Sequence, residues 1–141
     1  MLGRVSVCFA GGVFGGLVSA FGAWLSGAYG WTAALGVSIV PRWEADWVYP
    51  QLVHGGLWGL LFLLPAFVRT RFWRGFWVSL PPTMMQLLVV FPQDPKAGYG
   101  GLHYGEWTPL YVLLVNIVWG WATACWVMSI TDESDRLHRL H

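Results

Sequence analysis

Three polar side chains stand inside long apolar stretches of the sequence: His54, Gln86 and Asn116. Measured from the ends of the helices expected below, all three lie within ~5 to 11 Å of one membrane face, at a rise of about 1.5 Å per residue. Side chains at one depth on three helices can meet. They would either hold the helices together through hydrogen bonds of about 1 kcal/mol each, or line a polar cavity for a small molecule or protons, with His54 as its ionisable group.

Small and polar residues also recur at helical spacing on two of these helices. Residues at i, i+4 and i+7 share one helix face, so each set predicts a face that points into the bundle. The two sets are Ser79, Thr83 and Gln86, and Asn116, Gly120 and Thr123.

A histidine inside a membrane helix can ligate haem or a chlorophyll-type pigment. His54 is the only histidine within an expected span, so a haem with two histidine ligands cannot form within one chain. A pigment with one protein ligand, or a site shared with another subunit, stays open. The sequence requires no cofactor, although contact with lipid or pigment is compatible with it.

Other residues that could do chemistry are sparse. Asp94, His103 and Glu106 supply metal-ligand types, but a metal site needs three or four converging ligands. Their glycine-rich surroundings do not promise that order, and no metal site is predicted. No nucleophile motif, phosphate-binding loop or dinucleotide fingerprint is present, and no expected span holds an acidic residue. We therefore predict no catalytic residues and no enzymatic activity.

The composition is typical of a membrane protein. Of 141 residues, 56% are hydrophobic, 17% aromatic and only 11% charged, and eleven are tryptophan. Soluble domains carry about 25% charged residues. Here the charges separate apolar runs of about 20 residues, the length that a helix needs to cross hydrocarbon. The net charge of +1 offers no basic patch for nucleic acid. We predict an all-α, single-domain polytopic membrane protein.

Four transmembrane helices are expected, with spans at about 5–27, 51–68, 75–91 and 109–130. Residues 28–50 are rich in aromatic side chains, which prefer the headgroup level, and they hold too short an apolar run to cross alone. We interpret them as an interfacial or re-entrant connection. Residues 92–108 form an outer loop whose glycines argue against regular structure.

Glycines spaced four residues apart predict close helix packing. Small residues let two backbones approach each other where lipid gives no hydrophobic drive. The pattern does not name the partner helix, so packing within the chain and packing on another subunit both remain open. The pairs are Gly11 with Gly15, Gly12 with Gly16, and Gly55 with Gly59.

Pro81 and Pro82 stand in the middle of the third span. Each removes a backbone donor, which leaves the carbonyls of Trp77 and Val78 without their usual partners. A kink or break is expected there, with neighbouring hydroxyl groups or water satisfying the carbonyls.

The distribution of Lys and Arg predicts the orientation, because basic residues flanking membrane helices are retained in the cytoplasm. A basic turn between the second and third spans and both termini fall on one side, which is therefore expected to be cytoplasmic. The cytoplasmic set is Arg4, Arg69, Arg71, Arg74, Arg136 and Arg139, and the opposite set is Arg42 and Lys96.

The second half of the chain has a recognisable order of motifs. It shows Gln86-Leu87, Phe91-Pro92, a glycine-rich loop, and a last helix around Val118-Trp119-Gly120-Trp121. This order resembles the YagU-like family of small bacterial inner-membrane proteins. It covers about the last two spans, while the family's extended loops are shorter here and the N-terminal half shows no clear correspondence. The resemblance implies a multi-pass protein of a bacterial inner membrane and supplies no catalytic residues.

Abundant close-packing surface without catalytic chemistry predicts an accessory, assembly or stabilising subunit of a larger membrane complex. Its partners would be membrane lipids and either other membrane subunits or further copies of itself. The glycines of the first span would form the docking face. Two alternatives remain: a small transporter or channel with a polar site near the outer face, and a subunit associated with pigment or haem.

Overall fold

The computed structural model describes residues 1–65 and 70–140, and this part of the chain is helical without any strand. Four long segments form the bundle, and short helical turns connect or extend them. The elements are α1 (Leu2–Ala28), α2 (Trp31–Ala34), α3 (Ala45–Gly59), the 3₁₀ turn η1 (Leu60–Leu63), α4 (Arg71–Met85), the π turn η2 (Gln86–Val90), α5 (Phe91–Gln93), the 3₁₀ segment η3 (Tyr99–Tyr104) and α6 (Thr108–Arg139).

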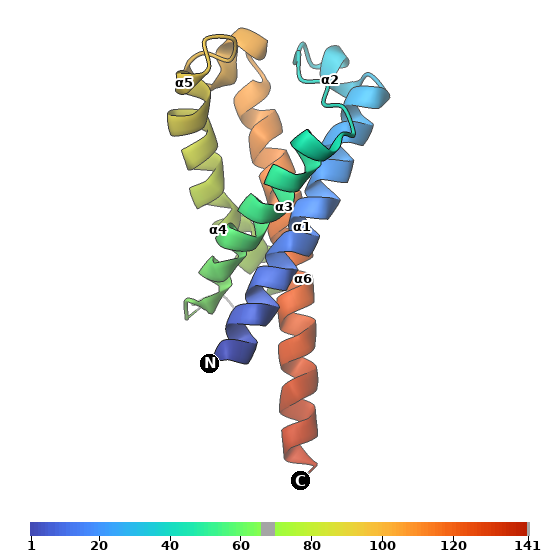
Figure 1. The fold of residues 1–141 in the computed structure, drawn as a ribbon, viewed down its shortest axis with the longest axis vertical. Helices are drawn as coiled ribbons and strands as arrows, with labels where there is room; N and C mark the ends of the chain where they lie inside the picture. Colours follow the sequence, from blue (N-terminus) through green and yellow to red (C-terminus); the bar gives the residue numbers. More distant parts are fainter. Residues whose placement is uncertain (66–69, 141) are drawn as a thin grey trace.

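The helices pack in the order α3, α1, α6, α4. α1 contacts both α3 and α6, and α6 contacts α4, whereas α3 and α4 are the two edges of the arrangement. Figure 1 shows both chain termini at one end of the bundle and α2 and α5 at the other. The central pair, α1 and α6, therefore packs together, with α3 on the outer side of α1 and α4 on the outer side of α6.

Within residues 1–65 and 70–140, three helical segments are long and apolar enough to cross a membrane. They are Leu2–Ala28, Arg71–Gln93, which joins α4 to η2 and α5, and Thr108–Arg139. Large apolar side chains such as Phe14, Trp77 and Leu114 point outward and are 39%, 55% and 49% exposed. Such a surface suits lipid and would be costly in water. The all-helical prediction is confirmed, and the fold is consistent with a membrane location.

The predicted second span, 51–68, is not one long helix. α3 begins at Ala45 and ends at Gly59, where η1 continues to Leu63. Pro50 lies inside α3 and removes only the donor for one carbonyl near the helix start, so the helix tolerates it. Residues 66–69, and with them Arg69, lie outside the described residues. Among the described residues, three helices and not four are thus individually long enough to cross a membrane.

The basic turn and the C-terminal tail also differ from expectation. Arg71 and Arg74 lie within the first turn of α4 and not in a loop. α6 does not end near 130 but continues to Arg139. Its 32 residues correspond to about 48 Å, which exceeds the ~30 Å of hydrocarbon. The C-terminal turns therefore project beyond the bundle (Figure 1).

α4 does not break at Pro81 and Pro82, because both lie inside the continuous helix Arg71–Met85. The departure from α geometry comes just afterwards, in the π turn η2. Side-chain hydroxyls do bond to carbonyls in this region: Ser79 Oγ donates to Phe76 O at 2.6 Å, and Thr83 Oγ1 donates to Ser79 O at 2.8 Å. These carbonyls flank the two that the prolines deprive, so the predicted compensation by hydroxyls is displaced by one residue.

The connections at the far end pack on each other. Ser38 N donates to Tyr104 O at 2.7 Å, which joins the 28–50 connection to η3. The loop 92–108 contains 3₁₀ turns that were not predicted, and a kink at Gly100 and Gly101 interrupts them, where positive φ angles of 64° and 71° are not helical. Burial raises the pKa of Tyr104, and so does the nearby Asp94 carboxylate. This carboxylate accepts a hydrogen bond from the Tyr104 hydroxyl. The hydroxyl thus remains a donor at neutral pH.

The glycines of α1 pack within the chain. A Cβ at Gly12 would meet Gly55 and Gly59 of α3, and one at Gly16 would meet Gln51 O at 2.6 Å. On the adjacent face, Gly11 and Gly15 lie against α6: a Cβ at Gly11 would be 2.9 Å from Trp126, and one at Gly15 would meet Trp119 O and Thr123. These faces are buried. The prediction that these faces dock another subunit is therefore wrong. Packing within the chain accounts for the glycine pattern.

A further glycine contact joins α4 to α6. A Cβ at Gly75 would lie 2.8 Å from Gly120 O, and one at Gly120 would meet Gly75 O and lie 3.3 Å from Ser79 Cβ. The sequence carried a signal for this seam, because Gly75, Ser79 and Thr83 are small residues at steps of four. The pairing itself was not predicted.

Candidate functional site

A cleft of about 650 Å³ lies between the two edge segments, α3 with η1 on one side and α4 with η2 on the other. α1 and α6 contribute its floor through residues such as Gly16 and Trp119. The volume falls within the range of about 300 to 1,000 Å³ typical of small-molecule sites. Because α3 and α4 are edges of the helix arrangement, the cleft faces outward between them.

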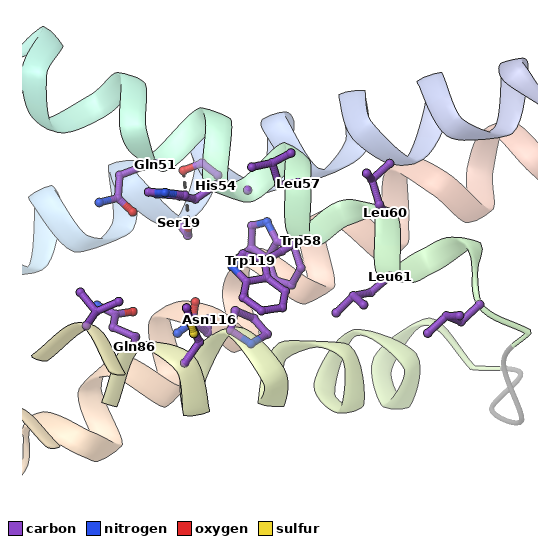
Figure 2. A pocket seen from close by; sticks show the side chains of 16 residues that line it. Ser19, Gln51, His54, Leu57, Trp58, Leu60, Leu61, Gln86, Asn116 and Trp119 are labelled. Atoms are coloured by element: carbon purple, nitrogen blue, oxygen red, sulfur yellow. Dashed lines mark hydrogen bonds between the residues drawn. The ribbon is translucent and has the colours of Figure 1, made fainter. Parts of the chain in front are cut away.

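One end of the cleft is polar. Ser19 from α1, Gln51 and His54 from α3, Gln86 from η2 and Asn116 from α6 all line it. Figure 2 shows Ser19, Gln51 and His54 on the wall opposite Gln86 and Asn116. Every long helical segment thus supplies a polar side chain at this level, which is the end toward the 28–50 and 92–108 connections.

The hydrogen-bonding state of these groups differs. The Ser19 hydroxyl donates to Gly16 O at 3.1 Å, so its proton is already used within α1. Asn116 Nδ2 is buried and has no hydrogen-bond partner in the described part of the chain. A buried amide donor without an acceptor costs about 1 to 3 kcal/mol. The polar end therefore contains a donor that still requires an acceptor.

The other end of the cleft is apolar. Leu57 of α3, Leu60 and Leu61 of η1, and Leu64 just after η1 line it. Figure 2 shows Leu60 and Leu61 far from the polar group. Trp58 and Trp119 lie between the two ends (Figure 2). The cleft is thus amphipathic along its length.

Trp119 is the main structural element of the cleft floor. It is 3% exposed and belongs to the core cluster with Cys8, Phe62 and Val127. Its indole Nε1 donates to Gly12 O at 3.2 Å, and its ring meets Phe62 edge-on with centroids 6.4 Å apart. The floor therefore depends on contacts among α1, η1 and α6.

Arg74 joins η1 to α4 without lining the cleft. Its Nη2 donates to Phe62 O at 2.8 Å, and its guanidinium lies 5.4 Å from the centre of the Phe62 ring. A hydrogen bond from a charged donor and a cation–π contact together hold η1 against α4.

No Asp, Glu, Lys or Arg appears among the described residues that line the cleft. Burying an unpaired charge in such a setting is expensive. The cleft therefore suits an uncharged ligand with a polar end and an apolar end.

The structure brings His54, Gln86 and Asn116 to one cleft, together with two residues that the sequence analysis did not single out. These are Ser19, which continues the small-residue face of Gly12 and Gly16, and Gln51, which lies one turn before His54. Their spacing of three residues from Gly16 and His54 was the available signal.

Ser79, Thr83 and Thr123 lie elsewhere, buried at helix contacts. Thr123 Oγ1 donates to Trp119 O at 2.8 Å, just as the other two hydroxyls bond within α4. Their hydroxyl protons are used within their own helices, so these residues act in packing and do not line the cleft.

The fold does not gather further metal-ligand side chains around the candidates named from the sequence, within the part of the chain that the structure describes. Among residues 1–65 and 70–140, no three His, Cys, Asp or Glu side chains come close enough to hold a metal ion. His103 Nδ1 lies 3.4 Å from Pro95 O. A pigment on His54 alone stays a prediction.

Comparisons with protein-family models, with curated proteins and with solved structures returned no match. The resemblance of the second half to the YagU-like family therefore stays a prediction.

Proposed function

We propose that this protein is a non-enzymatic integral membrane protein that binds a single-chain, lipid-like molecule with an uncharged polar head. The observation that carries the proposal is the amphipathic cleft, with polar side chains from all four long segments at one end and leucines at the other. The head would occupy the level of His54, Gln86 and Asn116. The chain would run past Trp58 and Trp119 toward Leu61.

The absence of ionised side chains from the described lining supports an uncharged head, since a phosphate or carboxylate would lack a cation. The volume of about 650 Å³ supports one chain and not a two-chain phospholipid. The proposed site is the polar level that the small-transporter alternative also uses. The accessory-subunit hypothesis is less well supported, because the glycines expected to dock another subunit pack within the chain.

The protein would take its ligand directly from the bilayer. α3 and α4 do not pack against each other along the cleft, so their gap faces lipid once the bundle lies in a membrane. We further propose that α3 with η1 provides a fourth crossing. Residues 45–63 correspond to about 28 Å at 1.5 Å per residue, close to the ~30 Å hydrocarbon thickness.

The chain path supports the same topology. α1 leads away from the end that carries the termini, and α4 starts at that end, where Arg71 pairs with Asp132 at 3.2 Å. α3 with η1 must return the chain between them. With basic residues concentrated at this end, both termini would be cytoplasmic, in the inner membrane of a bacterium.

Cysteine labelling tests the topology. In a Cys8→Ala, Cys125→Ser background, Ser134→Cys should react with an impermeant maleimide only after the cells are opened, and Lys96→Cys should react in intact cells. If α3 did not cross the membrane, the chain would cross three times. An odd number of crossings places the N-terminus and residue 134 in different compartments. Labelling of residue 134 from outside, with a cytoplasmic N-terminal reporter, would therefore contradict the fourth crossing.

Cleft binding is tested by filling its apolar end. Leu61→Trp should lower the cross-linking of a photoreactive monoacylglycerol, present in phosphatidylcholine nanodiscs, at least tenfold, because the indole occupies the volume needed by the chain. Leu114→Trp is the matched control, since Leu114 lies on the lipid-facing surface and is 49% exposed. Cross-links should map to α3, η1 and α4 in the unmodified protein. Equal labelling of all lipid-facing residues, unaffected by Leu61→Trp, would show that the cleft does not bind the chain.

A further inference from the structure

We infer that the head of the bound molecule carries a carbonyl oxygen that accepts a hydrogen bond from Asn116. This inference rests on the proposed function and narrows its ligand to a chemical class. Two kinds of membrane molecule share that chemistry: a quinone with one apolar chain, and an ester of glycerol with one fatty acid. Both combine uncharged oxygens with a single chain.

The inference starts from Asn116 Nδ2, which is buried at the polar end of the cleft without a partner in the described part of the chain. Buried polar groups in folded proteins are nearly always hydrogen-bonded. An amide NH₂ can only donate. This nitrogen has less than 1 Å² of accessible surface. A rotation of the amide about χ2 would turn it toward the cleft, where a ligand oxygen would remove the cost of the unpaired donor.

The opposite wall sets a second condition on the head. Gln51 and His54 face Gln86 and Asn116 across the cleft (Figure 2). The Ser19 hydroxyl already donates to Gly16 O, so the donors on that wall are the amide of Gln51 and a ring N–H of His54. A head with oxygens at two separated positions can therefore accept hydrogen bonds from both walls. A quinone ring carries two carbonyls, and a glycerol ester carries its carbonyl and hydroxyl groups apart.

Other membrane molecules fit less well. A hydrocarbon such as a carotene offers no acceptor, which leaves Asn116 unpaired. A fatty-acid anion or a phospholipid brings a charge that no ionised side chain among the described lining residues neutralises. The carbonyl-bearing, uncharged head satisfies both conditions together.

The test uses the full chain in phosphatidylcholine nanodiscs with three probes of equal chain length. Decylubiquinone and monodecanoylglycerol carry carbonyl groups, and decylbenzene carries no oxygen. Affinities are measured by native mass spectrometry for the unmodified protein, for Asn116→Leu, and for Gln93→Leu. The last is the control, because Gln93 is exposed at the end of α5 and does not line the cleft.

Decylubiquinone, monodecanoylglycerol or both should bind at least tenfold more tightly than decylbenzene. Asn116→Leu should weaken that binding about tenfold without weakening the binding of decylbenzene, and Gln93→Leu should change neither. Because leucine has a similar size and needs no hydrogen bond, the melting temperature of ligand-free Asn116→Leu should not fall. A quinone preference or an ester preference identifies the source of the carbonyl.

Unchanged affinity of both carbonyl probes for Asn116→Leu would overturn the inference. The proposed function would still stand in that case if Leu61→Trp displaced the probes. If every probe bound all variants, Leu61→Trp included, as tightly as the unmodified protein, the proposed function itself would be overturned. The two failures are therefore distinguishable.

Discussion

Gly12→Ala is expected to lower the free energy of unfolding by about 3 kcal/mol or more, the upper part of the range for overpacking. The added Cβ would meet Gly55 O and would lie 2.8 Å from Gly59 Cα and 2.9 Å from Gly55 C. All three are backbone atoms of α3, so no side chain can rotate away. The helices must separate, which also widens the cleft floor and weakens the indole contact of Trp119 with Gly12 O.

The measurement is the unfolding of the purified protein in mild detergent, followed by circular dichroism against temperature or denaturant. Gly22→Ala is the matched control on the same helix, because nothing lies within 4 Å of a Cβ there. Alanine is favoured over glycine in a helix by roughly 0.5 to 1 kcal/mol, so this variant should be slightly more stable. If Gly12→Ala were as stable as Gly22→Ala, the close α1–α3 contact would be disproved.

Trp119→Ala should cost about 3 to 5 kcal/mol of stability, as other large-to-small substitutions of buried aromatic residues do. The ring is 3% exposed, and its removal leaves a cavity beside Phe62 and takes the indole donor from Gly12 O. Because Trp119 also forms the cleft floor, binding of the photoreactive monoacylglycerol should fall in parallel.

Two variants separate these contributions in the same unfolding measurement. Trp119→Phe keeps most of the ring contact and loses the hydrogen bond, so its loss should be intermediate. Trp77→Ala removes a ring that is 55% exposed on the outer face of α4, and it should cost less than about 1 kcal/mol. A Trp119→Ala protein no less stable than Trp77→Ala would contradict the role of Trp119 in the core.

Several features followed from the sequence because they depend on short stretches of chain. The apolar runs and their lengths predicted helices at 5–27, 75–91 and 109–130, and the structure has membrane-length helices covering each of them. The spacing of the glycines predicted close approach. Depth arguments from helix rise placed His54, Gln86 and Asn116 at one level, and these three residues line one cleft.

Which surfaces meet was decided only by the tertiary structure. A small-residue face permits close packing with any helix of complementary shape, since lipid gives no hydrophobic preference among them. Gly12 and Gly16 therefore could not name α3, nor could Gly75 name Gly120. The prediction also placed the start of the second span after Pro50, whereas α3 begins at Ala45. A proline is typical of a helix boundary, so the sequence pattern alone favoured a start there.

The sequence by itself determined that the chain is a helical bundle with an apolar surface, few charges and a polar level, because helix length, polarity and periodicity are local properties. The tertiary structure alone decided that α3 and α4 remain apart, that Ser19 and Gln51 join the polar level, and that Asn116 Nδ2 is buried without a partner among the described residues. The reason is physical: a cleft exists only where surfaces fail to meet, and that depends on all helices at once.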